Sequence, residues 1–337
     1  MAECAVRLLP RRAALLAIAV VIAVTWTGAT TTASAQTDYP SQPIKLIVPY
    51  PAGSLIDVLG RSIGETLTAK LKQPVVVDNK PGASTLIGAK AVATAAPDGY
   101  TLLVPTVTTL SIAPQLVSKA GIDPLTEFTP IARLGATSFF LSVNPSFPAR
   151  TMAEWIAEVK KRPGKYTYAS AGHGTPHHIF MELLKTQLGL DIVHVPYKGS
   201  SSAIADLLEG RVDMAFLDGT LAIPNVKAGK LFAVGLSMAK RSVLLPSVPP
   251  IADTVPGFDW SGWIAVAGPA NMPAPIVTLL ADEIRTMQAT PQFSNLLNAA
   301  AMEPTEPISP EAMAAFVRSE YARWGPAIKA SGATSVE

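Results

Sequence analysis

The sequence predicts an α/β protein of two lobes, each a mostly parallel sheet flanked by helices. Apolar runs of strand length alternate with amphipathic stretches of helix length along most of the 337 residues. Turns that contain Pro and Gly separate these runs. Two segments, which begin at Ile44 and Tyr166, share the order strand, glycine-containing turn, helix. Such alternation favours right-handed crossovers between parallel strands.

The segment 44–57 is the first of these units and organises the expected first lobe. An apolar strand at 44–48 leads through a turn at 49–53 into a helix that continues to residue 71. In such units the turn lies at the carboxyl end of the sheet, where ligands bind. The N–H groups that open the helix carry partial positive charge, and Gly53 allows an anion to approach them closely. The turn is therefore a candidate anion site.

The remaining elements are expected in the following order. The first lobe continues with strand 75–78, helix 84–95 and strand 101–105, and the stretch 129–143 crosses to the second lobe. The second lobe has helix 152–161, strand 166–170, helix 176–188, strand 192–196, helix 201–209, strand 214–217, a helix to residue 227 and strand 231–236. Residues 260–268 return, and helices 275–287 and 309–324 pack on the first lobe. The expected lobes are 36–140 with 260–337, and 141–259, joined by a hinge of two chain crossings.

The N-terminus has the pattern of a secretory signal peptide over residues 1–35. Three arginines (Arg7, Arg11, Arg12) precede an uncharged apolar run at 13–24, and Ala33-Ser34-Ala35 fits a cleavage site. The apolar run is short for a membrane anchor, which is the alternative. Arg11-Arg12 also fits a twin-arginine signal weakly. We expect an exported, periplasmic protein that begins near Gln36 and is soluble after cleavage.

The mature chain has features that exclude several classes of function. Removal of residues 1–35 takes away three arginines and one glutamate, so the net charge falls from +2 to about zero. A neutral chain does not attract nucleic acid or an anionic membrane surface. The only cysteine, Cys4, lies in the signal segment, which excludes disulfides and thiolate chemistry in the mature chain. No phosphate-binding glycine motif is present.

Two patterns that suggest chemistry have simpler explanations. His173 and His177 have the spacing of helical metal ligands, but Gly174 and Pro176 break the helix between them, so we expect no metal and no cofactor. His178 is instead expected to face the cleft or to satisfy the turn backbone. Ser170, His178 and Asp218 supply the residue types of a serine hydrolase without its nucleophile elbow, so we expect no catalytic residue.

Three further residues have two possible roles each. Asp57 contacts a ligand or complements the positive charge of its own helix start. Tyr50 and Tyr197 each end a strand at a cleft turn, where each lines the ligand site or fills the interior of its lobe. Their position favours the ligand site.

Several phrases in a fixed order resemble the Bug-type periplasmic solute receptors of tripartite tricarboxylate transport. They span residues 39–332 and include YPSQPIKLIVPYPAG, VVVDNKPGA, IGAKAVATAAPDGYTLL, YASAGHGT, DIVHVPYKGS and WGPAIKASGA. The resemblance implies a two-lobed type II periplasmic binding protein fold. It also implies capture of a small carboxylate without chemistry, by a monomer that delivers it to membrane transporter components.

The resemblance also implies which turns hold the ligand. In the first lobe these are residues 50–57, with Tyr50, Gly53, Ser54 and Asp57, and the turn at Ser84 and Thr85. In the second lobe they are Ser170, Gly172, Gly174, Thr175, His178 and Asp218.

This sequence departs from the family pattern at the first-lobe turns. Leu55, Ile56 and Leu86 stand where relatives have small or polar residues. If they face the cleft, the ligand is a carboxylate with an apolar or aromatic body and not an amino-dicarboxylate; the alternative is that they face the lobe core. A co-receptor for a sensor kinase and an exported serine hydrolase are the alternative functions.

Overall fold

The structure is a computed structural model that describes residues 39–117, 119–197 and 199–333. The predicted signal peptide, residues 1–35, lies outside the described residues. Residues 40–337 cluster as one compact unit. No helix among the described residues is long and apolar enough to cross a membrane.

The larger of two sheets has six strands in the order β11-β4-β10-β3-β1-β2. Its strands are β1 (Ile44–Val48), β2 (Val75–Asn79), β3 (Thr101–Leu103), β4 (Phe128–Thr137), β10 (Gly262–Pro269) and β11 (Met302–Glu303). Strand β1 pairs in parallel with β2 and β3, whereas β10 runs antiparallel to β3 and β4. The sheet is therefore parallel at the β2 edge and antiparallel at the β11 edge.

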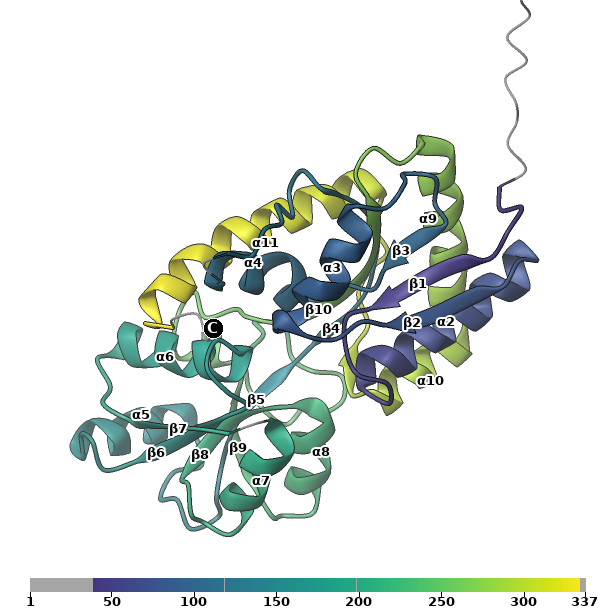
Figure 1. Ribbon diagram of the computed structural model, residues 1–337. Coiled ribbons are helices and arrows are strands. Elements are labelled where there is room, and N and C mark those ends of the chain that lie inside the picture. Colours follow the sequence, from purple (N-terminus) through teal and green to yellow (C-terminus); the bar gives the residue numbers. More distant parts are fainter. Residues whose placement is uncertain (1–38, 118, 198, 334–337) are drawn as a thin grey trace, which may run out of the picture. The chain divides into compact units, whose positions relative to one another are not determined.

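The smaller sheet has five strands in the order β7-β6-β8-β5-β9. They are β5 (Phe139–Val143), β6 (Thr167–Ser170), β7 (Val193–Pro196), β8 (Met214–Asp218) and β9 (Phe232–Leu236). Strand β6 is parallel to β7 and β8, and β5 is antiparallel to β8 and β9. The two sheets with their helices form two lobes (Figure 1).

The helices follow the expected alternation with the strands. With the larger sheet lie α2 (Leu55–Leu71), η1 (Ala83–Thr85), α3 (Leu86–Ala93), η2 (Thr108–Ile112), α4 (Ala113–Leu116), α9 (Ala274–Gln288) and α10 (Pro291–Ala299). With the smaller sheet lie α5 (Met152–Lys161), α6 (Pro176–Leu188), α7 (Ser200–Leu208), α8 (Gly219–Lys227) and η3 (Ile251–Asp253). The last helix, α11 (Pro310–Ala330), packs on β4 and η2 of one lobe and on α6 of the other.

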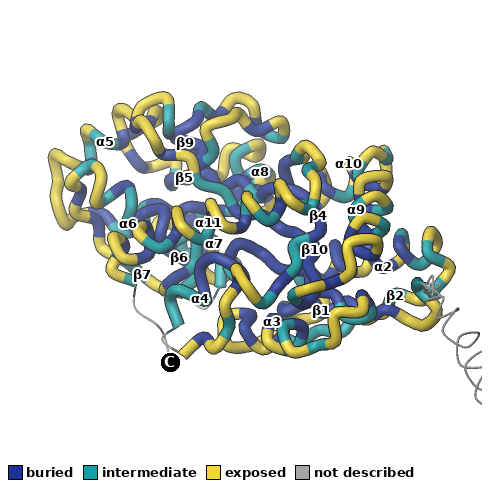
Figure 2. Tube along the Cα trace, turned by 90° about the horizontal axis from the view of Figure 1, so that it is seen from above, coloured by how far each residue is buried: buried dark blue, intermediate teal, exposed yellow. Residues whose placement is uncertain are grey.

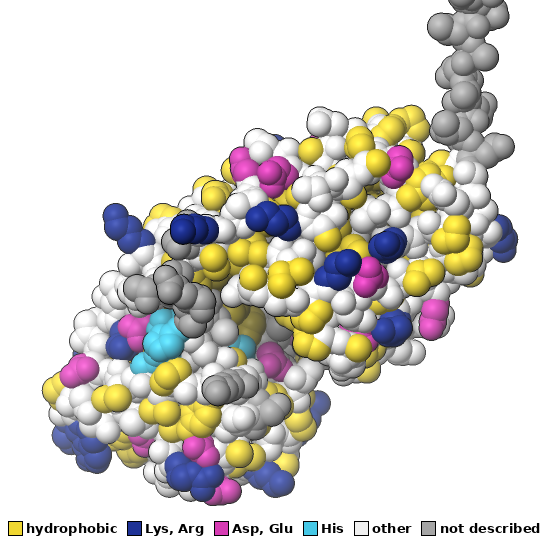
Figure 3. Space-filling view, in the orientation of Figure 1, with side chains coloured by type: hydrophobic (Ala, Val, Ile, Leu, Met, Phe, Trp, Pro, Cys, Tyr) yellow, Lys and Arg dark blue, Asp and Glu magenta, His cyan; other side chains and the backbone are white. Residues whose placement is uncertain are grey.

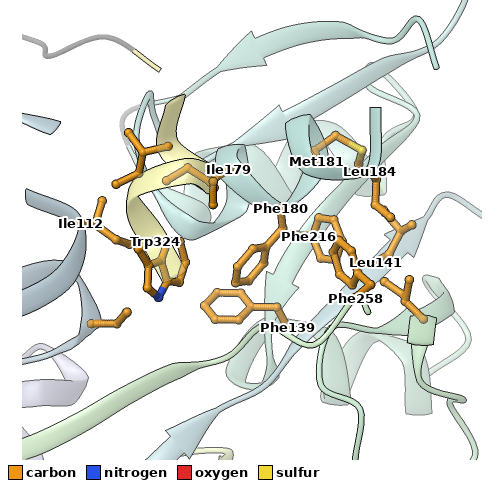
Figure 4. Packing of buried hydrophobic residues seen from close by; sticks show 14 of the residues in the cluster. Ile112, Phe139, Leu141, Ile179, Phe180, Met181, Leu184, Phe216, Phe258 and Trp324 are labelled. Atoms are coloured by element: carbon orange, nitrogen blue, oxygen red, sulfur yellow. The ribbon is translucent and has the colours of Figure 1, made fainter. Parts of the chain in front are cut away.

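One apolar core joins the two lobes. Ile112 of η2, Phe180 of α6, Phe216 of β8 and Trp324 of α11 belong to the same buried cluster, which Figure 4 shows. The rings of Phe180 and Trp324 lie 5.8 Å apart between their centroids. The buried residues follow the strands and the inner helix faces in Figure 2. Because this core is continuous, relative motion of the lobes is restrained by packing as well as by the chain crossings.

The first crossing differs from the continuous strand expected at 129–143. Strands β4 and β5 are separated by Ser138 and belong to different sheets. Beside the crossing, the buried carboxylate of Glu303 accepts hydrogen bonds from the Ser138 and Ser242 hydroxyls and from the Val243 N–H. The expected return crossing at 260–268 is also different, because β10 lies wholly in the larger sheet. The chain returns in the segment between β9 and β10.

Candidate ligand-binding site

The first-lobe turn is fixed by side chains that belong to it. Ser54 begins α2 as its N-cap, and its Oγ accepts the Asp57 N–H at 3.2 Å. Asp57 is 2% exposed and accepts hydrogen bonds from the Gly53 N–H at 2.8 Å, Arg61 Nε at 3.0 Å and Asn79 Nδ2 at 2.9 Å. Gly53 has φ of 79°, a conformation that glycine adopts without a Cβ penalty. Asp57 therefore holds the turn in shape.

The charge of Asp57 is stabilised by these same contacts. Burial would raise the pKa of this carboxyl, but hydrogen bonds from Arg61, Gly53 and Asn79 outweigh burial and lower it. Its carboxylate thus complements the start of α2, which is one of the two roles expected from the sequence.

The second-lobe turn, between β6 and α6, is held by hydrogen bonds of its own. Ser170 Oγ lies 2.7 Å from His194 Nε2 and accepts the Gly172 N–H at 3.1 Å. The Thr175 hydroxyl donates to the Gly172 carbonyl at 2.7 Å. The hydroxyls of both predicted site residues, Ser170 and Thr175, are therefore used within the turn.

His178 and His177, neighbours at the start of α6, have different surroundings. His178 is 4% exposed, accepts the Gly174 N–H at Nδ1 and stacks on His194. It thus satisfies the turn backbone, as the sequence allowed. Burial lowers the pKa of His178 to about 4 and that of His194 to about 3, so both rings are neutral at neutral pH.

His177 is the residue of this pair that lines a cavity. Its Nε2 lies 3.3 Å from Ser200 Oγ and 3.9 Å from an Asp218 carboxylate oxygen. Its Nδ1 is buried and has no hydrogen-bond partner among the described residues. The edge of the Phe139 ring packs against it at 5.2 Å between centroids. A buried nitrogen without a partner is costly unless a ligand or water pairs with it.

The cavity has a volume of about 250 Å³ and takes its walls from both lobes. The larger-sheet lobe contributes Tyr50, Leu55, Ile56, Thr106, Val107, Thr108, Thr137, Gly262, Trp263 and Ile264, and the other lobe Phe139, Pro176, His177 and Asp218. Two larger hollows, of about 540 and 340 Å³, lie beside α2 and have walls from the first lobe only. A third, of about 430 Å³, lies between α8 and the end of α10 and also has walls from both lobes. Figure 3 shows the hollow between the lobes, with histidine side chains beside it.

The walls combine apolar surface with a few polar groups. Tyr50 donates to or accepts from Thr106 Oγ1 at 2.8 Å, and burial raises the pKa of its phenol, which therefore stays neutral. Burial would raise the pKa of Asp218 too, but His177, Thr220 and the Leu221 N–H lower it by more. No lysine or arginine lines the cavity among the described residues. An anion bound here would be held by hydroxyl, backbone and imidazole donors.

The structure places the predicted residues in five different surroundings. Tyr50 and Asp218 line the cavity; Gly53, Ser54 and Asp57 shape the first turn, and Ser170, Gly172, Gly174, Thr175 and His178 the second. Ser84 and Thr85 lie in a left-handed turn with φ of 51° and 78°, where the buried Thr85 hydroxyl has no partner within the described part of the chain. Tyr197 donates to Asp206 at 2.5 Å and packs on the smaller sheet's own core, with its pKa raised to about 12 by burial and this bond.

Sequence reasoning missed several cavity residues. Phe139 and Trp263 follow the lobe crossings, and Thr106 and Thr108 follow β3; position after a strand was the available signal. His177 was considered only as a metal ligand. Leu55 and Ile56 do line the cavity, whereas Leu86 packs against Ala113 in a small core cluster.

The residues of the hydrolase alternative are not arranged as a triad. Ser170 pairs with His194, whose ring stacks between Tyr168 and His178. Asp218 lies beside His177 instead. A serine nucleophile needs a histidine that is itself oriented by an acid, and these contacts do not link the three groups.

Comparison with known proteins shows what the chain is similar to. Residues 59–333 match a family described as the tripartite tricarboxylate transporter family receptor. Protein BugT of Bordetella pertussis is 33% identical over 303 residues, which are 88% of this chain and 91% of that protein.

Solved structures show the same fold. A protein of R. palustris with adipate has 33% identity and a TM-score of 0.75, and the match covers 88% of this chain and all of that one. MatC from Rhodopseudomonas palustris, with bound malate, has 28% identity and a TM-score of 0.72 over 86% of this chain and all of its own. The periplasmic binding protein BugD has 31% identity and a TM-score of 0.71, over 88% of this chain and 99% of its own.

Proposed function

Because the chain belongs to the tripartite tricarboxylate transporter receptor family, we propose that it is a periplasmic receptor that binds a small organic carboxylate between its lobes. The observation that carries this proposal is the cavity whose walls come from both lobes. Its volume of about 250 Å³ suits a small acid better than a drug-sized molecule. The relatives solved with adipate and malate support a carboxylate as the ligand.

His177 is the strongest donor candidate for the carboxylate. Nε2 faces the Ser200 hydroxyl and the Asp218 carboxylate, and with a hydrogen on Nδ1 the buried Nδ1–H has no acceptor within the described protein. A ligand carboxylate supplies that acceptor. The hydroxyls of Tyr50 and Thr108 on the opposite lobe complete a set of neutral donors. The ionised Asp218 repels a second carboxylate beside it and so orients the ligand.

The apolar walls favour a ligand with an aliphatic or aromatic body. Leu55, Ile56 and Trp263 offer no hydrogen-bond partner for an ammonium group; the carboxylate of Asp218 is the lining group that could pair with one, and it already accepts from Thr220. Comparison of aspartate with the other acids below tests the preference. Adipate has two more methylene groups than succinate, and each buried methylene contributes about 0.8 kcal/mol. We therefore expect adipate to bind about tenfold more tightly than succinate or malate.

Calorimetry on unfolded, washed and refolded protein tests the proposal. The panel is adipate, succinate, malate, aspartate and an aromatic carboxylate. His177→Ala should weaken the best ligand about tenfold or more, because it removes a hydrogen bond to a charged group. Thr186→Ala, at an exposed position of the same helix, is the control. No binding by any carboxylate, or equal affinity in His177→Ala, contradicts the proposed site.

Delivery of the ligand to a membrane transporter is part of the same proposal, with a sensor kinase as the alternative partner. The family to which the chain belongs supports the transporter. Loss of carboxylate uptake in cells that lack the receptor, with uptake restored by the wild-type chain and not by a variant that does not bind ligand, is the expected result. Unchanged uptake together with lost transcriptional response would favour the sensor.

A further inference from the structure

Three of the four histidines form a cluster on the second lobe, outside the cavity. His173 lies in the β6–α6 turn, His178 in the first turn of α6 and His194 on β7. One nitrogen of each ring lies within 4.8 Å of one nitrogen of each of the others. The His173 ring meets the other two edge-on, at 5.3 Å from His178 and 4.9 Å from His194 between centroids.

We propose that His173, His178 and His194 bind one divalent transition-metal ion of the Zn²⁺ class. Imidazole nitrogen is a preferred ligand of Zn²⁺, and three histidines with one open position are a common zinc arrangement. The sequence argued against a metal because it paired His173 with His177. The structure replaces His177 by His178 and adds His194, which is distant in sequence and is brought in by the β6–β7 pairing.

The elements that hold the rings differ in rigidity, which suits a site that closes on an ion. His194 is fixed by Ser170 on one nitrogen and by the Tyr168 ring, which stacks on it at 4.6 Å. His173 is exposed and lies between Gly172 and Gly174, both with positive φ, so it can turn toward the other two. The exposed side leaves room for a water molecule as the fourth ligand.

Metal binding requires a modest rearrangement of the two inner rings. His178 and His194 are stacked at 4.4 Å between centroids, with 22° between their planes. A zinc ion instead lies in the plane of each imidazole ring that binds it. The His178 ring must turn relative to the fixed His194 ring so that their nitrogens converge to the distance of about 3.3 Å that bonds of ~2.0–2.1 Å require. The hydrogen bond from Gly174 to His178 Nδ1 is long, at 3.3 Å, and is weak competition for a metal ion.

The carboxylate of Glu182 supports the cluster through its hydrogen bonds to neighbouring side chains. Glu182, one turn after His178 on α6, accepts the Tyr168 hydroxyl at 2.5 Å and pairs with Lys185 at 2.7 Å. Because the Tyr168 ring stacks on His194, these contacts also hold the His194 ring in place.

The test measures Zn²⁺ binding by the whole mature chain, purified without a histidine tag and treated with chelator. Calorimetry and competition with a chromogenic zinc indicator should give one ion per chain, with a dissociation constant below about 10 µM. Co²⁺ in place of Zn²⁺ should give the visible absorption bands of a four-coordinate site.

His173→Ala is the decisive variant, because the residue is exposed and its loss should not impair folding, which a thermal melt checks. We expect Zn²⁺ affinity to fall at least about tenfold, as even the loss of a supporting contact at a zinc site costs this much. His177→Ala, next to the cluster but on the cavity side, is the matched control and should bind Zn²⁺ like the wild type. The proposal is overturned by weaker wild-type binding than about 10 µM, by equal affinity in His173→Ala, or by an equal loss in His177→Ala.

Discussion

Replacement of Asp57 by Ala tests whether this carboxylate builds the first-lobe turn. The change leaves the Gly53 N–H and the Asn79 amide without their acceptor in a site where Asp57 is 2% exposed. Arg61 is half exposed, so water replaces its lost bond at little cost. Because Gly53 is exposed and Asn79 keeps the Tyr50 carbonyl as an acceptor, each lost hydrogen bond should cost about 0.5–1.5 kcal/mol, so the free energy of unfolding should fall by about 1–3 kcal/mol.

The pH dependence of this effect has a definite sign. The folded protein lowers the pKa of Asp57, so its stabilising charge is fully present above the unfolded value of about 3.9. That contribution is lost as the pH falls through the lower, folded pKa. Asp57→Asn, which cannot ionise, should therefore lose stability relative to the wild type at pH 7 and approach it at the acid end.

Urea unfolding followed by tryptophan fluorescence measures both effects. Asp78→Ala is the matched control, since Asp78 lies on neighbouring β2, is only partly buried and pairs with Lys80 at 3.6 Å. This control should change the free energy of unfolding by less than about 0.5 kcal/mol. If Asp57→Ala unfolds like the control, the carboxylate does not hold the turn and is free for a ligand.

Three other changes probe the remaining structure. Glu303→Ala removes the acceptor for three donors beside the lobe crossing, so we expect a loss of about 2–4 kcal/mol in urea unfolding, which an unchanged midpoint would contradict. Gly174→Ala places a Cβ 2.1 Å from a Leu116 methyl of the other lobe, so the lobes must shift apart there and carboxylate affinity should fall. The control is Gly189→Ala, which has a similar φ but open space around it, and an equal loss of affinity in both variants would refute the role of the contact. Thr151→Ala removes a capping-box hydroxyl and should cost about 1 kcal/mol.

Local sequence patterns predicted most elements because their causes are local. Helix α5 begins at a capping box and ends at a pair of lysines, and α6 lies between Pro176 and Gly189; both have the expected bounds. The two-residue β11 exists only because it pairs with β4, and no local pattern encodes that. The break between β4 and β5 at Ser138 is also determined by tertiary structure, because the two halves of one apolar stretch join different sheets.

The sequence predicts the candidate site as a set of turns. The structure separates the residues that hold these turns in shape from the residues that line the cavity. Glycines and small hydroxyl residues marked where the chain turns at strand ends, which periodicity and turn chemistry reveal. Which side chain faces the cavity depends on helix rotation, which sequence does not fix. His177 and His178 show this: one residue of shift decides which of two histidines meets the cavity.

That rotation also connects the two proposed sites. Consecutive residues of a helix point about 100° apart, so the first turn of α6 directs His177 to the cavity and His178 to the histidine cluster. A metal ion that fixed the β6–α6 turn would fix the start of the helix that carries His177. Linkage requires the effect to be mutual: if Zn²⁺ changes carboxylate affinity by some factor, the carboxylate changes Zn²⁺ affinity by the same factor. Titrations of each ligand with and without the other measure that factor, and a factor of one in both would show that the two sites are not coupled.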